Sequence, residues 1–326
     1  MDNIYSYGAH NGSCKLYTVD SFNHEISNSH SIFVLNFNIR SFNRNFDEFS
    51  TFLGELKFLP DILILTETWF SGDSCGHIEG FSGFHCTREG GRIGGGVSIF
   101  IKNSLSVKVS VHSSVSKPEI EYQHIILQDN FKNIHVIGVY RPPNSSLVER
   151  FNAEFEGILE GIPPSKRVIA AGDFNICGLN QENHTLNYIE VARAYCLIPH
   201  ISIPTRPNPN GNDSLLDHIW SNFGTSFRGG IFENLDISDH LICFVMVPLR
   251  RSEKKRKIVF RDHSDENILK MSERLENFAL FFPLLTATLD FNSKFNLFFD
   301  EINRIYNVSC PTKTKELSSN SIKKTL

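Results

Sequence analysis

The chain has 326 residues, of which 40% are hydrophobic and 21% charged. This is the composition of a folded globular protein, and it excludes a disordered or collagen-like chain. The 32 Lys and Arg residues against 36 Asp and Glu residues give a net charge of −4, which excludes a positive field over the whole molecule. A nucleic-acid enzyme stays open, because basic residues can gather on one face.

The seven cysteines include no pair separated by two residues, so the pattern of a zinc ribbon or a redox pair is missing. We therefore expect reduced thiols in an intracellular protein. The N-terminus lacks the cationic and apolar regions of a secretory signal. The apolar stretch 278–285 is interrupted by Pro283 and is shorter than the about 20 residues of a spanning helix. We expect no membrane segment.

The predicted elements begin after a polar leader, residues 1–30, which shows no periodicity and is expected to be flexible. A strand follows at 31–39, rich in β-branched and aromatic residues. Apolar residues at three- and four-residue steps predict a helix over 46–56, which Pro60 ends. The run 61–66 has the apolar character of a buried strand.

Strand-like and helix-like runs then alternate along the chain. The further predicted strands are 97–101, 107–111, 122–127, 134–140, 167–171, 215–220 and 241–247, and the further predicted helices are 147–158 and 183–196. Strands interleaved with helices, many of them in hairpin-like succession, predict an α/β fold with a mixed sheet or two packed sheets.

The composition changes after Leu249. Residues 250–257 form a basic run, which is the predicted domain boundary, and two helical apolar stripes follow at 268–278 and 295–305. We therefore expect one domain over 31–249 and a basic linker with a helical segment over 250–326.

Polar residues stand where predicted strands end. Four strand-like runs end in an acid or an amide: Asn38, Glu67, Asp173 with Asn175, and Asp239 with His240. Side chains at strand ends can leave the core and meet at one edge of a sheet. Several of them on successive strands predict a shared pocket.

The residue types suit a metal ion and a phosphate. Glu67 and Asp239 offer hard oxygen ligands of the kind that Mg²⁺ prefers. Asn38 and Asn175 can orient a phosphate or a water molecule without adding negative charge.

The remaining groups suit proton transfer. Asp173 can accept a proton from an attacking water, and His240 can interact with a phosphate oxygen. Asp217 lies within an apolar strand, where a buried carboxylate needs a partner, and it could fix the tautomer of His240. Together these residues indicate metal-assisted phosphodiester hydrolysis.

Each motif alone has a simpler interpretation. The sequence 172–175 could be a plain turn, Ser238 to His240 a helix cap, and Glu67 a solvated charge. Arg141 could be a solvated loop residue, and the glycines of 90–96 lack the Lys-Ser/Thr of a phosphate-binding loop.

Taken together and in order, the motifs are distinctive. They are Asn38-Ile-Arg-Ser, Glu67-Thr-Trp, Val139-Tyr-Arg-Pro-Pro143, Gly172-Asp-Phe-Asn175, Leu216-Asp-His-Ile-Trp220 and Ser238-Asp-His240. This series resembles the endonuclease/exonuclease/phosphatase family, over about residues 32–248. More narrowly, it resembles the apurinic-endonuclease-like domain of non-LTR retrotransposon polyproteins, which Arg92-Ile-Gly-Gly-Gly-Val and Pro204-Thr-Arg also match.

The resemblance implies a DNase I-like fold, a four-layer α/β sandwich with two packed mixed β-sheets and outer helices. The active site would lie at one end of the sandwich. Glu67 would bind the catalytic Mg²⁺, for which Mn²⁺ can substitute, with Asn38 and Asp239 nearby.

The resemblance also implies roles for the other motif residues. Asp173 would activate or position the water, Asn175 would hold the phosphate, and Tyr140 would contact the scissile phosphate. Asp217 would orient His240, which would stabilise the charge that develops on the phosphate.

Three further residues match positions near the DNA backbone in the retrotransposon branch: Thr205, Arg206 and Ser214. One position departs from many relatives, because Arg40 stands two residues after Asn38 where they carry an acid. Arg is usual at this position in the retrotransposon subgroup, and it weakens the case for a second, acid-bound metal.

The implied activity is a Mg²⁺-dependent endonuclease that nicks one strand of double-stranded DNA. The resulting 3′-hydroxyl would prime reverse transcription of the element's RNA. The sequences 256–262 and 310–315 resemble the linker to a reverse transcriptase, so we expect a fragment of a longer element that acts in the nucleus. Two alternatives stay open: another family enzyme, such as an abasic-site repair nuclease or a phosphatase, and a catalytically silent DNA-binding remnant.

Overall fold

The computed structural model describes residues 14–26, 31–71, 75–88, 94–128, 133–180, 182–223, 228–233, 235–248 and 256–317. The chain divides into two compact units, Met1–Arg250 and Arg251–Leu326. The glycine-rich motif at 90–93 and most of the basic run at 250–257 lie outside the described residues.

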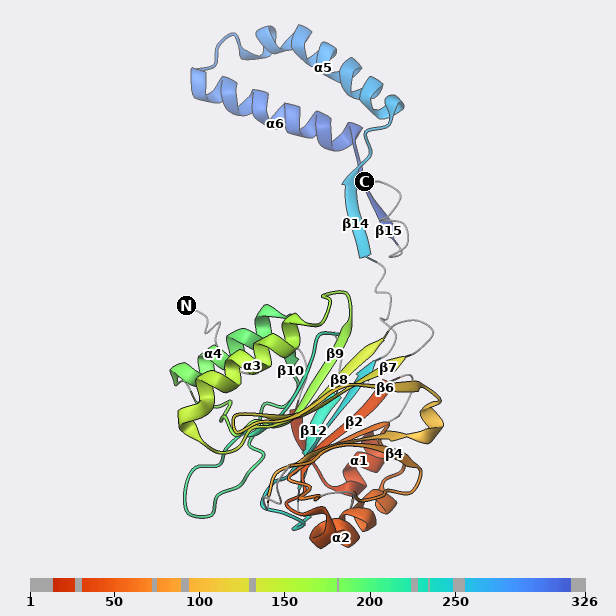
Figure 1. Cartoon of the computed structure of the whole chain (residues 1–326). Helices are drawn as coiled ribbons and strands as arrows, with labels where there is room; N and C mark the ends of the chain where they lie inside the picture. Colours follow the sequence, from red (N-terminus) through yellow and green to blue (C-terminus); the bar gives the residue numbers. More distant parts are fainter. Residues whose placement is uncertain are drawn as a thin grey trace. The chain divides into compact units, whose positions relative to one another are not determined.

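The first unit is built on two sheets, the first of which has seven strands in the order β1-β12-β13-β2-β3-β5-β4 (Figure 1). Its strands are β1 Cys14–Tyr17, β2 Ser31–Asn38, β3 Ile62–Thr66, β4 Phe81–Cys86, β5 Val97–Lys102, β12 Arg228–Phe232 and β13 Ile242–Pro248. Strand β2 pairs parallel with β3 and antiparallel with β13, so the sheet is mixed.

The second sheet has six strands in the order β10-β11-β9-β8-β7-β6. Its strands are β6 Lys108–Ser116, β7 Glu121–Gln128, β8 Ile134–Tyr140, β9 Arg167–Asp173, β10 Ile198–Pro199 and β11 Asp217–Ser221. Strands β8 and β9 run parallel, and the other pairs are antiparallel.

Helices cover the outer face of each sheet (Figure 1). Helices α1 Val19–Glu25 and α2 Phe42–Glu55 pack against the first sheet, and α3 Val148–Glu160 and α4 Asn183–Ala194 pack against the second. Short 3₁₀ turns lie at Asn103–Leu105 and Ser145–Leu147. The four layers confirm the predicted DNase I-like α/β sandwich.

Side-chain type distinguishes the core between the two sheets from the core under the helices of the first sheet. Between the sheets the core is aliphatic, with residues such as Ile64, Val136 and Val245 fully buried. Under α1 and α2 it is rich in phenylalanine, and Phe22 contacts the rings of four other phenylalanines. β-Branched residues pack well on pleated surfaces, and aromatic rings bury a large apolar area under the helices.

The expected flexible leader is wrong for residues 14–26. Residues 14–17 form β1, which pairs parallel with β12, and 19–25 form α1, whose Phe22 is fully buried. Thr18 caps this helix, since its hydroxyl accepts the Ser21 N–H at 3.2 Å. The segment is too short for its periodicity to stand out among polar neighbours.

The second unit consists of a helical pair and a strand pair. Strands β14 Arg256–Arg261 and β15 Thr312–Leu317 are antiparallel, and α5 Asp265–Thr286 and α6 Phe291–Ser309 lie between them in the chain. Rings of Phe278, Phe282 and Phe298 pack between the helices. None of the helices in the described part of the chain has the length and apolar character needed to cross a membrane.

Candidate active site

Polar side chains from both sheets meet at one end of the first unit. Asn38 ends β2, Glu67 follows β3, and Tyr140 and Asp173 end β8 and β9. Because β2 is parallel to β3 and β8 is parallel to β9, each pair presents its carboxyl ends at one edge. The strand-end residues of the sequence therefore come together in a single hydrogen-bonded cluster.

Asn38 joins the two sheets at this edge. Its buried amide Nδ2 donates to Asp173 Oδ2 at 2.8 Å and to Glu67 Oε1 at 3.1 Å. Its Oδ1 accepts the Arg40 backbone N–H at 3.1 Å. The side chain thus holds two carboxylates close together without adding a charge of its own.

Glu67 is held in an unusual backbone conformation. Its φ is +50°, in the left-handed region that non-glycine residues rarely adopt. Its Oε1 also accepts the Tyr140 hydroxyl at 3.3 Å, and its Oε2 accepts the Trp69 indole N–H at 3.2 Å. Such strain is characteristic of functional sites, where surrounding contacts enforce it.

The turn after β9 orients Asp173. Its Oδ1 accepts the backbone N–H of Asn175 at 3.0 Å, and the Asn175 Nδ2 lies 3.3 Å from its Oδ2. Gly172 has no alternative here, because a Cβ atom would lie 1.7 Å from the Val139 carbonyl oxygen. Asn175 itself has a φ of +46°. The motif is thus more than a plain turn, since Asn175 holds the Asp173 carboxylate and Gly172 permits the close approach of β9 to β8.

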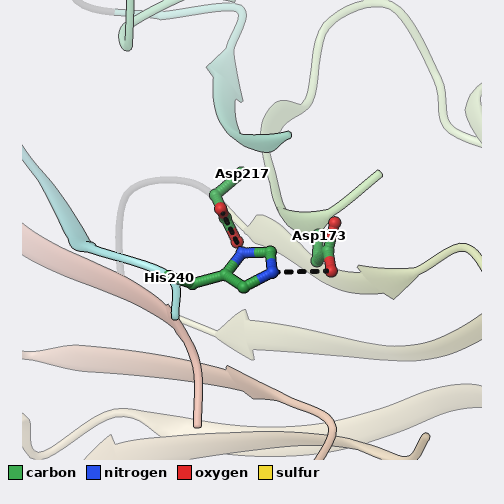
Figure 2. Close-up of side chains that lie close together, drawn as sticks. All are labelled: Asp173, Asp217 and His240. Atoms are coloured by element: carbon green, nitrogen blue, oxygen red, sulfur yellow. Dashed lines mark hydrogen bonds and ion pairs between the residues drawn. The ribbon is translucent and has the colours of Figure 1, made fainter. Parts of the chain in front are cut away.

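His240 lies between two aspartates (Figure 2). Its Nδ1 lies 2.7 Å from Asp217 Oδ2, and its Nε2 lies 4.0 Å from Asp173 Oδ2. The side chain of Thr205 donates to the same Asp217 oxygen at 2.7 Å. Ser238 fixes the loop that carries His240, because its hydroxyl donates to the Asn38 carbonyl and accepts the His240 N–H.

The charges around His240 set its protonation. Burial alone would lower its pKa, but the carboxylates of Asp217, Asp173 and Asp239 outweigh this and raise the pKa to about 9. Burial, and then the charge of Asp217, raises the pKa of Asp173. At neutral pH His240 is therefore an imidazolium that faces a carboxylate of increased basicity.

The gap between His240 and Asp173 has a useful width. At 4.0 Å it is too long for a direct hydrogen bond. One oxygen atom can lie about 2.8 Å from both groups, within the normal hydrogen-bond range. A phosphate oxygen or a water molecule placed there would contact a proton donor and a proton acceptor together.

Asp239 has different surroundings from those the sequence predicted. Arg40 Nη1 lies 2.7 Å from its Oδ1, and Arg206 donates to its Oδ2 through Nε at 3.1 Å and Nη2 at 2.7 Å. Burial would raise the pKa of Asp239, but these guanidinium groups outweigh it and lower the pKa. Both oxygens are engaged by cations, so Asp239 is a poor choice for a metal ligand.

The three residues predicted to lie near DNA, Thr205, Arg206 and Ser214, differ in their exposure and their contacts. Arg206 and Ser214 form an isolated antiparallel bridge at the base of a loop, with the Arg206 side chain 43% exposed. Thr205 is fully buried, so its side chain has no exposed surface for contact with DNA. Its hydroxyl instead positions Asp217, which sequence spacing alone could not indicate.

The structure also corrects the interpretation of Arg141 as a solvated loop residue. Its side chain is 4% exposed rather than solvated, and it donates to the carbonyls of Phe174 at 2.7 Å and Asn144 at 3.0 Å. In return, the Asn175 Nδ2 donates to the Arg141 carbonyl at 2.8 Å. Arg141 thus clamps the turn that carries Asp173 and Asn175, and its place beside two prolines was the only hint in the sequence.

Two places at this end could hold a metal ion. Ligand atoms of Asp173, Asp217 and His240 all lie within 4.8 Å of one another. However, a histidine must lose its proton to bind a metal, and the raised pKa of His240 opposes this. The donors to Glu67 are uncharged, so a divalent cation matches Glu67 better than it matches Asp239.

This fold and this arrangement of carboxylates, amides and an imidazolium define a phosphoester hydrolase. The family model described as the endonuclease/exonuclease/phosphatase family matches residues 35–240, more than half of the chain. The protein belongs to this family and is an enzyme of the phosphodiesterase and nuclease type. Enzymes of this family depend on metal ions.

Solved structures with the same fold include several nucleases. The endonuclease domain of TRAS1, a telomere-specific non-LTR retrotransposon, aligns with a TM-score of 0.54 and 16% identity, over 68% of this chain and all of that one. The AP endonuclease LMAP from Leishmania major gives 0.56 and 14%, over 70% and 90% of the two chains. An AP endonuclease from Archaeoglobus fulgidus gives 0.51 and 15%, over 67% and 100%. The search of curated proteins returned no match.

Proposed function

We propose that this protein is a Mg²⁺-dependent DNA endonuclease of a non-LTR retrotransposon, which nicks one strand of duplex DNA and leaves a 3′-hydroxyl. The observation that carries the proposal is the buried Asp217–His240 pair, whose Nε2 faces Asp173 across 4.0 Å at the strand ends. This geometry places a proton acceptor and a proton donor on two sides of one reacting group.

Asp173 acts on the attacking water. Its carboxylate is fully buried and oriented by Asn38 and Asn175. Its raised pKa makes it a stronger base than a solvated carboxylate. Asp173 therefore accepts the proton of the water as the new bond to phosphorus forms.

His240 acts on the phosphate. Protonated at neutral pH, it donates from Nε2 to a phosphate oxygen on which negative charge grows. Asp217 keeps the proton on Nδ1 and stabilises the imidazolium. Thr205 holds Asp217 from the other side, so that the ring does not turn away.

Glu67 and Asn38 are the residues that would hold the divalent cation, with Tyr140 donating to Glu67 beside it. When bound, Mg²⁺ or Mn²⁺ supplies charge stabilisation and polarises a phosphate oxygen. Tyr140 is buried, and burial followed by the charges of Glu67 and Asp173 raises the pKa of its hydroxyl. It therefore stays protonated and serves as a hydrogen-bond donor.

The DNA backbone would pass over the partly exposed arginines. The side chains of Arg40 and Arg206 are 52% and 43% exposed, and both flank Asp239 beside His240. Although the chain has a net charge of −4, this pair gives local positive charge where a phosphate backbone would approach. We assign Arg206, Ser214 and the loop between them to contacts with the DNA phosphate backbone.

Two sequence features support the retrotransposon branch over other enzymes with this fold. Arg40 stands where many relatives carry an acid, and the structure pairs it with Asp239. Pro204-Thr205-Arg206 matches the same branch. In the structure Thr205 donates a hydrogen bond to Asp217, and Arg206 donates to Asp239. In that setting the nicked end would prime reverse transcription of element RNA by a partner reverse transcriptase in the nucleus.

The test is nicking of supercoiled plasmid by the purified 326-residue chain. We expect relaxed circles in Mg²⁺, none in EDTA, and a 3′-hydroxyl at each nick that a DNA polymerase can extend. Intact plasmid in Mg²⁺, with a folded protein confirmed by circular dichroism, would reject the nuclease and favour a silent DNA-binding remnant.

A second candidate is an abasic-site nuclease. A cavity of about 890 Å³ reaches His240 and is lined by apolar side chains such as Phe37, Leu235 and Ile242, which suits a sugar without its base. Cleavage rates on an abasic duplex and on an intact duplex of the same sequence decide between the two. A strong preference for the abasic duplex would favour repair.

A further inference from the structure

Three histidines gather on the helix-covered face of the second sheet, apart from the catalytic residues. They come from three adjacent strands: His112 from β6, His124 from β7 and His135 from β8. The ring centroids of His112 and His124 are 4.5 Å apart, and those of His124 and His135 are 5.1 Å apart. The function proposed above uses none of these imidazoles.

A β-bulge brings His112 into this group. Val111 pairs with Ile125 and Ser113 pairs with His124, so the register shifts and His112 has no ladder partner. A bulge inserts one residue and redirects a side chain. Without it, the strict alternation of a strand would place residues 112 and 113 on opposite faces.

Two of the rings already have the spacing of metal ligands. His124 Nε2 and His135 Nδ1 lie 3.0 Å apart. Two nitrogens bound to one tetrahedral zinc ion, each at 2.0–2.1 Å, lie about 3.3–3.4 Å apart. The two nitrogens therefore need to move apart by only a few tenths of an ångström, with a turn of the rings that aims both lone pairs at the ion, to exchange the hydrogen bond for a shared cation.

Both inner rings are neutral and ready to bind. Burial, followed by the neighbouring His112 and His135, lowers the pKa of His124 to about 3. Burial also lowers the pKa of His135. Neither ring is therefore a cation at neutral pH, in contrast to His240, and a change of tautomer moves the proton between the rings to the far nitrogen of its ring when an ion binds.

The site is open to an ion. A cavity of about 480 Å³ is lined by His112, His124, Tyr122 and Glu154, and by glycines 157 and 161 of the α3 segment. A Cβ atom at Gly157 would meet nothing within 4 Å, so this part of the helix leaves room over the rings. The ring centroids of His112 and His135 are 6.3 Å apart, so the His112 ring, which is exposed, must turn toward the other two to complete the site.

We propose that His112, His124 and His135 form a second metal site, for Zn²⁺ or a similar first-row transition-metal ion with a preference for imidazole. His124 and His135 supply the fixed pair of nitrogens, His112 closes the site, and water from the cavity completes the coordination. His135 and Tyr140 are five residues apart on β8, about 16 Å along an extended strand. The ion therefore ties the edge strand β6 to the sheet without touching the reacting phosphate.

The first test measures Zn²⁺ binding to the full chain without a polyhistidine tag, by calorimetry in excess Mg²⁺. We compare the unchanged protein with His112→Ala, His135→Gln and the control His77→Ala, which removes an exposed histidine elsewhere. Loss of a ligand should weaken Zn²⁺ binding by about tenfold or more, whereas the control should bind as before. Equal affinity in all four proteins would overturn the proposal. Because His112 is exposed, its variant keeps the test valid if His135→Gln fails to fold.

The second test separates this site from the catalytic one. Glu67→Gln should leave the histidine-dependent Zn²⁺ binding unchanged, whatever its effect on DNA cleavage. In crystals soaked with Zn²⁺, anomalous scattering should show a peak about 2.0–2.1 Å from His124 Nε2 and His135 Nδ1. A peak at the strand-end carboxylates alone would show that the soak worked and that the histidines bind no zinc.

Discussion

Two of the aspartates near His240, Asp217 and Asp239, have opposite surroundings. Asp217 is fully buried and is held by the Thr205 hydroxyl and the His240 ring. The side chain of Asp239 is 32% exposed and is held by Arg40 and Arg206. The buried carboxylate sets the protonation of a catalytic group, whereas the exposed one organises two cations that face solvent. In the proposed function, the inner part of the site, which is Asp173, Asp217 and His240, performs the chemistry, and the outer part, which is Arg40, Arg206 and Asp239, binds DNA.

The largest expected effect is in the inner part. Asp173→Ala and His240→Ala should each reduce the rate of plasmid nicking by about 10²–10⁴-fold, the usual range for a general acid or base. Affinity for DNA should change little, because neither side chain belongs to the outer cations. Single-turnover rates and filter binding measure the two quantities. A large loss of affinity with an unchanged rate would reverse the assignment of the two parts.

The second-largest expected effect is a loss of folding stability at alkaline pH, where His240 loses its proton. A raised pKa stabilises the fold fully below the unfolded value of 6.5, and this stabilisation is lost as pH rises toward about 9. Its size is on the order of 3 kcal/mol, since one pKa unit corresponds to about 1.4 kcal/mol. Urea unfolding of the unchanged protein and of His240→Gln should therefore differ most near pH 6 and converge above pH 9. A constant difference across this range would show that His240 is not charged in the folded state.

Thr205 connects Asp217 to the surrounding backbone through hydrogen bonds. Removal of its hydroxyl should affect stability and rate less than the changes at Asp173 and His240. Thr205→Val takes one donor from Asp217 and leaves the backbone N–H groups of Leu216 and Asp217 without their acceptor. We expect the free energy of unfolding to fall by about 1–3 kcal/mol. The alkaline limb of the pH–rate profile should also move, because His240 loses part of its orientation. Thr205→Ser should restore both, and a Ser variant that behaves like Val would indicate a packing role only.

The smallest effect is expected in the outer part. Arg206→Ala should raise the KM for DNA several-fold, leave kcat nearly unchanged and make the salt dependence of binding shallower by about one unit of slope. Arg150→Ala is the matched control, because Arg150 is exposed on α3. A fall in kcat with unchanged salt dependence would place Arg206 in the chemistry instead.

The strand-end pattern of the sequence predicted the inner part well. Asn38, Glu67 and Asp173 each follow an apolar run, and the structure brings them into hydrogen-bonding contact. The predicted pairing of Asp217 with His240 is also present, at 2.7 Å. These contacts depend on strand ends meeting at one edge, which local sequence can indicate.

The outer part and the supporting contacts were not predictable in the same way. Arg40 and Asp239 are far apart in sequence, and only the folded chain brings their charges together. Thr205 was assigned to DNA because it matches a position near the DNA backbone in the retrotransposon branch, but its side chain is fully buried and its hydroxyl donates to Asp217. The segment 14–26 was missed because β1 takes its order from β12, over 200 residues away.

The central claim is that Asp173 and His240 act on one phosphate, and a double-mutant cycle tests it most directly. Single-turnover nicking rates in Mg²⁺ are measured for the unchanged protein, Asp173→Asn, His240→Gln and the double variant. If the two residues act as a unit, the double variant should be no slower than the slower single variant. Losses that multiply in the double variant would show that the two side chains act independently, and would contradict the account.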